Sequence, residues 1–516
     1  MHREGITSGA PSETSALLVR AARGALWSWS GQVLKQVGQV GIVMILARWL
    51  TPADFGRVAM IGVVTGFLSL FGELGIGPAL IQKRELRQVH LVAAFWGSLA
   101  MGLVVMSLLM VGAPMVGAMY ADAMLAPLTV ALAVNFPLVA LATVPLQLLQ
   151  RELRLDRLAL VELLSLAVGG ALAVSLALGG AGAWSLVGQT LATSGTTAVA
   201  AWRLASARLK DAAGSPTHAV REALGELLRF GRPLVGSNVL TYITRNADTA
   251  LIGRFLGAQA LGYYALAYRL LLFPLQNISW ALGRALFPAL ARVSDPEHVR
   301  RGYQCVVEGI ALVAFPMMIG MAIVAPELIR LLYGPQWEPA VFPARLFCGL
   351  GALQAIGTTI GPLCLSQGRP DILLRWNLLF APAVVGSIAV GVRWGLEGVA
   401  LAYTSVSGVA WYFSHALANR VIALPMSLFL RALVPAAAST FIMALGVILV
   451  RVLVIRPWVS NALVALVLQA GIGASLYALM LRRLRPNAFS DLRAVMRAVG
   501  FGRFAGDPDR SASAPA

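Results

Sequence analysis

Charged residues are scarce in this sequence. Asp, Glu, Lys and Arg make up 12% of its 516 residues, whereas a soluble domain contains about 25%. Hydrophobic residues make up 58%, and no soluble core could bury that much apolar surface, because the buried fraction of a globular chain rises only slowly with length. The apolar residues form blocks of about 20, long enough to cross a bilayer as helices, and they do not alternate with polar residues as in a membrane β-barrel. We therefore expect an all-α membrane protein.

Cysteine is also scarce, and the usual signatures of metal sites and ATP-driven proteins are missing. The cysteines Cys305, Cys348 and Cys364 lie in apolar segments without a CxxC motif or a Cys/His cluster, so neither a disulfide nor a metal site is expected. The sequence has no Walker motif that would indicate ATP binding. Residues 1–23 lack an apolar region followed by a cleavage site, so we expect no removable signal peptide. We expect a protein without cofactors.

Hydropathy divides the chain into about fourteen transmembrane helices. They are predicted at residues 24–47, 57–80, 90–113, 124–147, 158–179, 182–203, 232–254, 262–286, 305–329, 341–364, 371–392, 396–418, 430–452 and 460–481. A cytoplasmic N-terminal segment (1–23) precedes a first six-helix bundle (24–203), and a basic cytoplasmic linker loop (204–231) leads to a second six-helix bundle (232–418). Helices 13 and 14 (419–481) and a cytoplasmic tail (482–516) complete the chain.

The basic residues indicate the orientation of these helices. The net charge of +18 would suggest nucleic acid as the partner of a soluble protein, but here the arginines lie in short loops between apolar blocks. Every second loop is rich in Arg and Lys, whereas the turns near Asp122 and Gly180 hold neither. Because cytoplasmic loops carry the excess of positive charge, both termini are predicted in the cytoplasm, and no nucleic-acid partner is expected.

An internal repeat relates the two predicted bundles. Residues Arg48–Gly56 align without gaps on Arg254–Gly262, at a constant offset of 206 residues. Each segment covers the end of a first helix, a short turn and the start of a second helix. Because six helices is an even number, the bundles have the same orientation and should be related by a pseudo-two-fold axis along the membrane normal. Repeats of this kind occur in secondary transporters, which rock one bundle against the other around a site at their interface.

The repeat segment also resembles a known family. Leu46–Gly56 and Gly75–Gln82 are similar to the opening of bacterial polysaccharide flippases of the Wzx type, closest to the colanic-acid-exporter group of the multidrug/oligosaccharidyl-lipid/polysaccharide flippase superfamily. Further matches within residues 24–370 are Gln150–Arg154, Gly182–Leu186, Arg245–Asp248, Ile252–Gly257, Leu286–Leu290 and Gly334–Trp337. The resemblance implies an undecaprenyl-pyrophosphate-linked oligosaccharide that is flipped from the cytoplasmic to the periplasmic leaflet of the inner membrane.

Lys35 lies near the middle of the first predicted helix. It follows Ser28 and Gln32 and precedes Gln39 at helical spacing, so these residues form one polar stripe. Charges in hydrocarbon are costly and usually face a cavity or a partner. One interpretation is a cavity wall on which Lys35 and Gln39 bind a pyrophosphate. The other is a lysine that reaches the interface or pairs with a carboxylate.

Two later helices also concentrate cations on one face. Arg245 and Asp248 lie on the face of helix 232–254 that carries Asn238, Thr241 and Tyr242; they are candidates for substrate binding and ion coupling, or form a structural pair.

On helix 262–286 the stripe contains Arg269, Trp280 and Arg284. Arginine suits phosphate oxygens and tryptophan suits sugar rings, although Arg284 is equally explained as an interfacial anchor. A cationic cavity between the bundles, lined by Lys35, Arg245 and Arg269, is the predicted binding site.

The carboxylates Glu73, Glu162 and Glu308 are further candidates for ion or proton sites, and Asp248 is a further candidate for ion coupling. Glu73 has a structural alternative, because it lies close in sequence to Lys83 and Arg84 and would pair with either.

Three functions fit the sequence. The first is a flippase for lipid-linked oligosaccharide, which serves surface polysaccharide export and works beside a polymerase and a chain-length regulator. The second is an ion-coupled small-molecule antiporter of the same superfamily, which the excess of cationic over acidic candidates argues against. The third is a membrane-embedded polymerase or glycosyltransferase, which would need carboxylates on a sizeable external loop. We therefore expect a transporter and not an enzyme.

Overall fold

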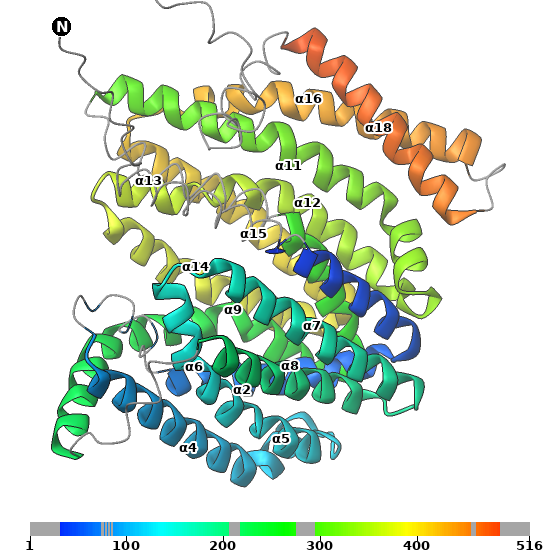
Figure 1. Ribbon diagram of the computed structural model, residues 1–516. Coiled ribbons are helices and arrows are strands. Elements are labelled where there is room, and N and C mark those ends of the chain that lie inside the picture. The colour runs from blue at the N-terminus through cyan, green and yellow to red at the C-terminus, as the bar shows by residue number, and fades with distance from the viewer. Residues whose placement is uncertain are drawn as a thin grey trace, which may run out of the picture. The chain divides into compact units, whose positions relative to one another are not determined.

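The structure, a computed structural model, describes residues 31–32, 34–73, 77, 80, 83, 86–205, 217–274, 295–455 and 461–485. Within these residues the regular elements are helices, without strands (Figure 1). Nine helical stretches of the described chain are long and apolar enough to cross a membrane. Some of them hold more than one helix, and the longest, Pro370–Val421, holds two helices of 22 and 27 residues. The protein is therefore a multi-pass membrane protein. The count of fourteen stays a prediction, as does the two-bundle layout.

The described residues divide into two compact units, Met1–Gly262 and Tyr263–Ala516, called unit 1 and unit 2. Unit 1 contains an unlabelled helix at 34–49 and the helices α2 (Pro52–Glu73), α4 (Gln88–Tyr120), α5 (Leu125–Ala133), α6 (Asn135–Arg151), α7 (Leu155–Leu178), α8 (Ala183–Leu204) and most of α9 (Thr217–Pro274). Helix α4 continues seven residues past the predicted end at 113, because Pro114 is accommodated inside it, and it ends at Ala121 in the left-handed conformation (φ 55°).

Small residues let the helices of unit 1 approach closely. Helix α7 packs along α8, and α6 packs against both α4 and α8. A Cβ atom on Gly169 of α7 would lie 2.0 Å from Oγ1 of Thr193 in α8, and one on Gly102 of α4 would lie 3.1 Å from the carbonyl oxygen of Phe136. Glycine is needed at such helix contacts, as is usual between membrane helices.

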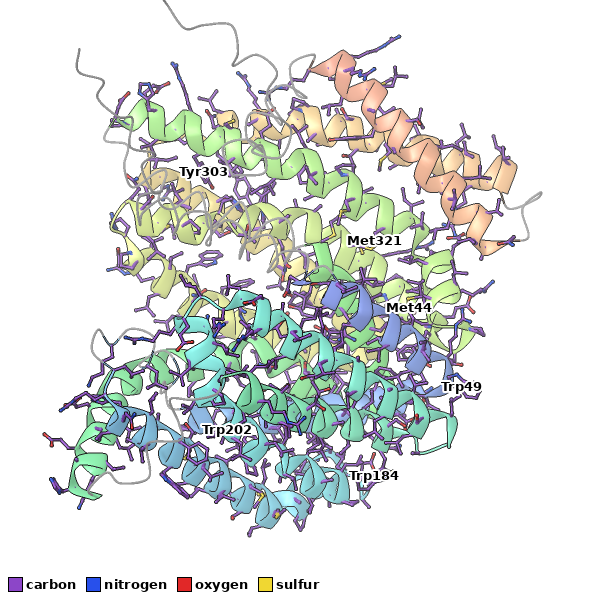
Figure 2. All side chains as sticks on the ribbon, viewed as in Figure 1. Met44, Trp49, Trp184, Trp202, Tyr303 and Met321 are labelled. Carbon is purple, nitrogen blue, oxygen red and sulfur yellow. The ribbon has the colours of Figure 1, made fainter. Side chains whose placement is uncertain are left out.

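Helix α8 is not among the nine apolar stretches, because Ser, Thr and Gln interrupt its apolar residues. Its ends nevertheless carry two partly exposed tryptophans, Trp184 and Trp202 (Figure 2). At 1.5 Å per residue they lie about 27 Å apart along the helix axis, close to the thickness of the hydrocarbon layer. Tryptophans gather at both membrane interfaces, so this spacing supports the predicted span at 182–203, which stays a prediction.

Helix α9 joins the two units. It combines the predicted helices 232–254 and 262–286 as far as Pro274, with a break at Gly257 (φ 82°, ψ 179°) that only glycine adopts without strain. The residues of the predicted linker loop from Thr217 onward are helical. Leu224 and Leu228 from this part pack against the core cluster formed by α4 and α6.

The two repeat segments contact each other through their backbones. A Cβ atom on Gly56 would lie 1.7 Å from the carbonyl oxygen of Ala258, and one on Gly262 would lie 1.9 Å from that of Pro52. Pro52 and Ala258 are separated by the same 206 residues as Gly56 and Gly262. Reciprocal contact of equivalent residues is the pattern of a two-fold related interface. It supports the repeat, while a rotation about the membrane normal stays a prediction.

Unit 2 contains α11 (Pro296–Leu332), the short η3 (Pro335–Ala340), α12 (Val341–Gly357), α13 (Ile360–Ser366), α14 (Pro370–Gly391), η4 (Val392–Trp394), α15 (Gly395–Val421), α16 (Met426–Val450), η5 (Arg451–Ile455) and α18 (Ala462–Leu484). Helix α11 packs against α12, α16 and α18, and α15 packs against α12 and α14. Ile323, Met443 and Val447 form the apolar contact between α11 and α16.

Candidate functional site

The first predicted cation, Lys35, has a carboxylate partner. Its Nζ lies 3.1 Å from Oε2 of Glu162 on α7, and the two side chains are 35% and 38% exposed. Gln39, one turn later, is exposed. The structure therefore agrees with the interpretation in which Lys35 pairs with a carboxylate, and its partial exposure leaves the ammonium accessible as well.

The predicted residues of α9 differ in burial. Asp248 is 8% exposed, and its Oδ1 accepts a hydrogen bond of 2.7 Å from the backbone N–H of Thr249. Arg245, one turn earlier, is exposed. The carboxylate of Asp248 is thus buried, whereas the guanidinium of Arg245, three residues earlier on the same helix, is exposed.

Arg269 lies on the last section of α9, in unit 2, and is exposed. Burial raises the pKa of Tyr333, which follows α11, and the nearby positive charge of Arg269 opposes that rise. The guanidinium of Arg269 therefore lies near the end of α11. Trp280 and Arg284 lie outside the described residues, as does the side chain of Glu73 at the end of α2.

Glu308 is buried in α11 and forms an ion pair with Arg485, directly after α18. Its charge is thus compensated by a cation from the last described helix. A second pair lies nineteen residues further along α11, where Arg451 approaches Glu327 to 2.7 Å and also donates to the carbonyl oxygen of Ile323 at 2.9 Å.

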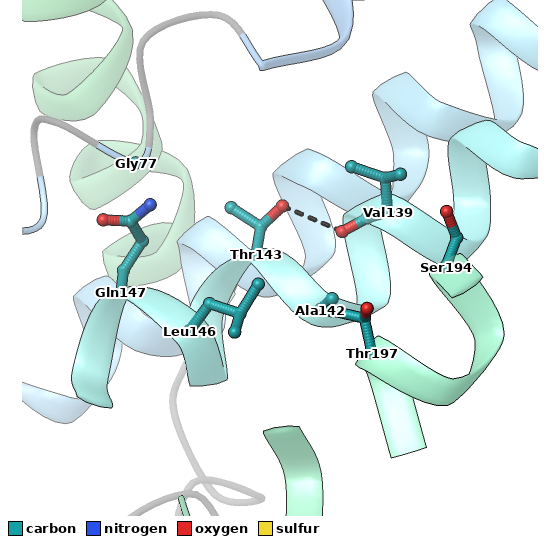
Figure 3. Close-up of a pocket in the computed structure, with 8 residues that line it drawn as sticks. All are labelled: Gly77, Val139, Ala142, Thr143, Leu146, Gln147, Ser194 and Thr197. Carbon is teal, nitrogen blue, oxygen red and sulfur yellow. Dashed lines mark hydrogen bonds between the residues drawn. The ribbon is translucent and has the colours of Figure 1, made fainter. Parts of the chain in front are cut away.

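Two cavities of unit 1 are lined, among the described residues, by uncharged side chains. One cavity of about 210 Å³ lies between α6 and α8 (Figure 3), and its polar lining is Thr143, Gln147, Ser194 and Thr197. A second cavity of about 180 Å³ lies toward α2 and α4, and its polar lining is Thr65, Ser69, Asn135 and Thr143. Val139 and Thr143 line both, so the two cavities adjoin along α6 and are together called the α6 groove below.

The groove follows a stripe of residues on α6. Asn135, Val139, Thr143 and Gln147 recur every four residues, which places them on one face of a helix. No Asp, Glu, Lys, Arg or His is found among the described residues that line it. The groove is thus polar without being charged.

The hydrogen bonds of the lining leave acceptor atoms unused. Thr143 donates its hydroxyl proton to the carbonyl oxygen of Val139 at 3.0 Å, and Thr197 lies 2.8 Å from both Oγ of Ser165 and the carbonyl oxygen of Thr193. Oδ1 of Asn135 and Oε1 of Gln147 are buried without a hydrogen-bond partner among the described residues. Because buried polar atoms normally have partners, these two oxygens suit a ligand that donates hydroxyl protons.

The α6 groove was not predicted from the sequence, because the candidate site residues there are uncharged and the predicted site rests on charged residues in membrane helices. A signal was present in two places: the four-residue spacing of Asn135, Thr143 and Gln147, and the dense Ser, Thr and Gln residues of segment 189–197. Hydropathy alone marks both segments as spans and assigns them no role.

Comparisons with known proteins agree with this architecture. A family model described as polysaccharide biosynthesis protein matches residues 45–342. The chain is 26% identical over 411 residues to the lipopolysaccharide biosynthesis protein WzxC of Escherichia coli (strain K12), covering 76% of this chain and 81% of WzxC. It is 29% identical over 377 residues to the succinoglycan biosynthesis transport protein ExoT of Rhizobium meliloti (strain 1021), covering 70% of this chain and 73% of ExoT.

A solved structure shows the same fold. The lipid II flippase MurJ in its inward closed conformation superposes with a TM-score of 0.69 at 13% identity, covering 90% of this chain and 100% of that chain.

Proposed function

Because this chain belongs to the polysaccharide biosynthesis protein family, we propose that it flips undecaprenyl-pyrophosphate-linked oligosaccharide repeat units across the bacterial inner membrane. The resemblance to Wzx-type flippases noted in the sequence is confirmed by the family match and the relatives. The observation that carries the proposal is the α6 groove, a polar uncharged cavity inside a bundle of membrane helices. Such a cavity receives a hydroxyl-rich group that the hydrocarbon layer would exclude.

The pyrophosphate requires cations, and the exposed arginines are the proposed source. Arg245 and Arg269 both present guanidinium groups that are accessible in the structure, and arginine forks bind phosphate oxygens bidentately. Lys35 is proposed to join them by exchanging Glu162 for the phosphate. Gln39, Trp280 and Arg284 complete the proposed substrate-binding set.

Coupling to an ion is proposed for Glu73, Asp248 and Glu308. For Asp248 the supporting observation is its burial, because a buried carboxylate binds or releases a proton or Na⁺ at a cost that depends on its surroundings. Glu308 would act by exchanging Arg485 for the ion. Alternating access between two six-helix bundles of equal orientation is the proposed motion.

The proposed location is the inner membrane with both termini in the cytoplasm, beside a polymerase and a chain-length regulator. Reporter fusions at Ser12 and Ala514 test the topology, and both should report the cytoplasm. A periplasmic signal from either fusion contradicts it.

Deletion of the gene tests the function. In cells that make the polysaccharide, the deletion should stop surface display and leave completed lipid-linked repeat units in the cytoplasmic leaflet, measured by glycosidase protection in sealed right-side-out vesicles. Unchanged display together with altered resistance to cationic drugs would instead identify a small-molecule antiporter. Shortened or unlinked repeat units would identify a polymerase or glycosyltransferase.

A further inference from the structure

We propose that the α6 groove is a binding subsite for an uncharged sugar ring of the lipid-linked substrate, and that it discriminates against acidic sugars. The proposal rests on the proposed function, since it assigns part of the transported molecule to a particular place in unit 1. It separates the sugar from the cationic residues proposed for the pyrophosphate.

The size of the cavity between α6 and α8 fits one ring. Its 210 Å³ equals about seven water molecules at about 30 Å³ each, a space that one pyranose ring and its hydroxyl groups occupy. Three apolar side chains, Val139, Ala142 and Leu146, contribute to the same wall. They offer contact to the C–H face of a ring while the polar residues meet its hydroxyl groups.

The hydrogen-bonding capacity of the lining fits hydroxyl groups. Oε1 of Gln147, which lines this cavity, has no hydrogen-bond partner among the described residues, and the amide N–H groups of the same side chain are donors. Each sugar hydroxyl both donates and accepts. The ring therefore supplies a proton to Oε1 of Gln147, whereas Asn135, about 18 Å away along the helix axis, lines the neighbouring cavity.

Gly77 leaves room for the amide of Gln147. A Cβ atom on Gly77 would lie 3.0 Å from Nε2 of Gln147, and Figure 3 shows Gly77 beside that amide at one end of the cavity. A larger residue at 77 would press on the amide. The lining thus leaves Gln147 in place as a polar group that projects into the cavity.

Discrimination against acidic sugars is expected because the described residues that line the α6 groove carry no charge. A uronic acid would bring a carboxylate into a groove whose described lining offers it no Lys, Arg or His. An ionised group buried without a partner is costly. A neutral sugar meets no such cost.

The test uses the purified full-length protein in nanodiscs and three probes. They are a polyprenyl pyrophosphate, the same lipid linked to glucose, and the same lipid linked to glucuronate. The wild-type protein should bind the glucose-linked lipid about tenfold more tightly than the bare lipid, as one or two additional hydrogen bonds provide. The glucuronate-linked lipid should bind no more tightly than the bare lipid.

Gln147→Leu should remove the tenfold advantage of glucose and leave the affinity for the bare lipid unchanged. Gln150→Leu is the matched control, because Gln150 lies on the same helix, is exposed and does not line the groove. Thr143→Val, which preserves the shape of the side chain, provides a second variant if Gln147→Leu does not fold. It should lower the glucose advantage while also leaving the bare lipid unaffected.

Equal binding of the three lipids by the wild-type protein would overturn the subsite and leave the flippase function intact. A loss of affinity for all three lipids in Gln147→Leu would also overturn it, because the residue would then be structural. Failure of the proposed flippase function would give a different result from failure of the subsite. The bare lipid would not bind, and deletion of the gene would not affect surface display.

Discussion

The polar residues of units 1 and 2 are used in different ways. Along α6 and α8 of unit 1, uncharged groups line a groove and two amide oxygens have no partner among the described residues. Between α11, α16 and α18 of unit 2, charged groups are paired, as in Arg451 with Glu327. The helices around the groove instead meet through glycines. Unit 1 does have ion pairs, but Arg57 and Asp122, 2.8 Å apart, lie at the ends of helices, and Lys35 and Glu162 are 35% and 38% exposed.

This difference separates two roles of polar residues in a membrane protein. A polar group that is satisfied by a neighbouring helix holds the two helices together, and its removal exposes the partner. A polar group that faces a cavity with unused acceptors contributes to binding a ligand. Variants of the first kind should therefore affect stability, whereas variants of the second kind should affect transport.

The largest effect on stability is expected for Glu327→Ala. It would leave Arg451, whose side chain is 14% exposed, without its partner, and breaking a buried pair costs about 3–5 kcal/mol. Thermal unfolding of the detergent-solubilised protein should show a large decrease in Tm. The control is Glu338→Ala, since Glu338 and its partner Arg330 are 66% and 63% exposed; its Tm should stay close to wild type. Equal Tm values for the two variants would contradict the structural role of the buried pair.

A smaller loss of stability is expected for Gly56→Ala and Gly262→Ala. Each added Cβ overlaps a backbone oxygen of the other repeat segment, and forced overpacking costs about 1–3 kcal/mol. Because both glycines belong to one contact, the double variant should lose less than the sum of the single losses.

Gly62→Ala is the matched control on α2, since a Cβ atom there meets nothing within 4 Å. It should not lower the Tm. Additive losses in the double variant would show that the two glycines act independently.

A still smaller effect is expected for Tyr242→Phe. The Tyr242 hydroxyl donates to the carbonyl oxygen of Val63 at 2.9 Å and connects α9 to α2. Its removal should cost about 1 kcal/mol and make the amides around Val63 exchange faster with deuterium. Unchanged exchange there would show that this hydrogen bond does not hold the two helices together.

The smallest effect concerns the ion pair between Lys83 and Glu226, at the N-terminal end of α9. Lys83 holds the pKa of Glu226 below its ordinary value of 4.5. A lowered carboxylate pKa stabilises the folded state above that value, and the stabilisation is lost as the pH falls through the folded-state pKa. Protease cleavage near residue 217 should therefore increase in acid below about pH 4.5. Glu226→Gln should cleave equally at neutral and acidic pH; acid-dependent cleavage in this variant would exclude Glu226 as the cause.

Composition and hydropathy predicted the helical membrane class because both depend on the local sequence alone. The segment predicted at 371–392 is α14 (Pro370–Gly391), with both boundaries shifted by one residue. The continuation of α4 past Pro114 was not predicted, since proline usually marks a helix end in solution and is tolerated in membrane helices.

The sequence identified several charged residues as candidates but not their partners. Lys35 and Glu162 are 127 residues apart, and Glu308 and Arg485 are 177 apart, so only the folded chain shows that they pair. The α6 groove was missed for a different reason, because neutral Ser, Thr, Asn and Gln residues hardly change the hydropathy of a span. Their grouping around one cavity requires α6, α8 and α2 to be packed together.

The central claim is that the chain moves lipid-linked oligosaccharide, with the groove of unit 1 in contact with its sugar. The most direct test reconstitutes the wild-type protein, Gln147→Leu and Glu338→Ala in liposomes that contain a fluorescent polyprenyl-pyrophosphate oligosaccharide with neutral sugars. The fraction of label in the outer leaflet is then followed by membrane-impermeant quenching. We expect the wild type and Glu338→Ala to exchange the label between leaflets at the same rate, and Gln147→Leu to exchange it about tenfold more slowly at equal protein content. Exchange by the wild-type protein no faster than in protein-free liposomes would contradict the claim.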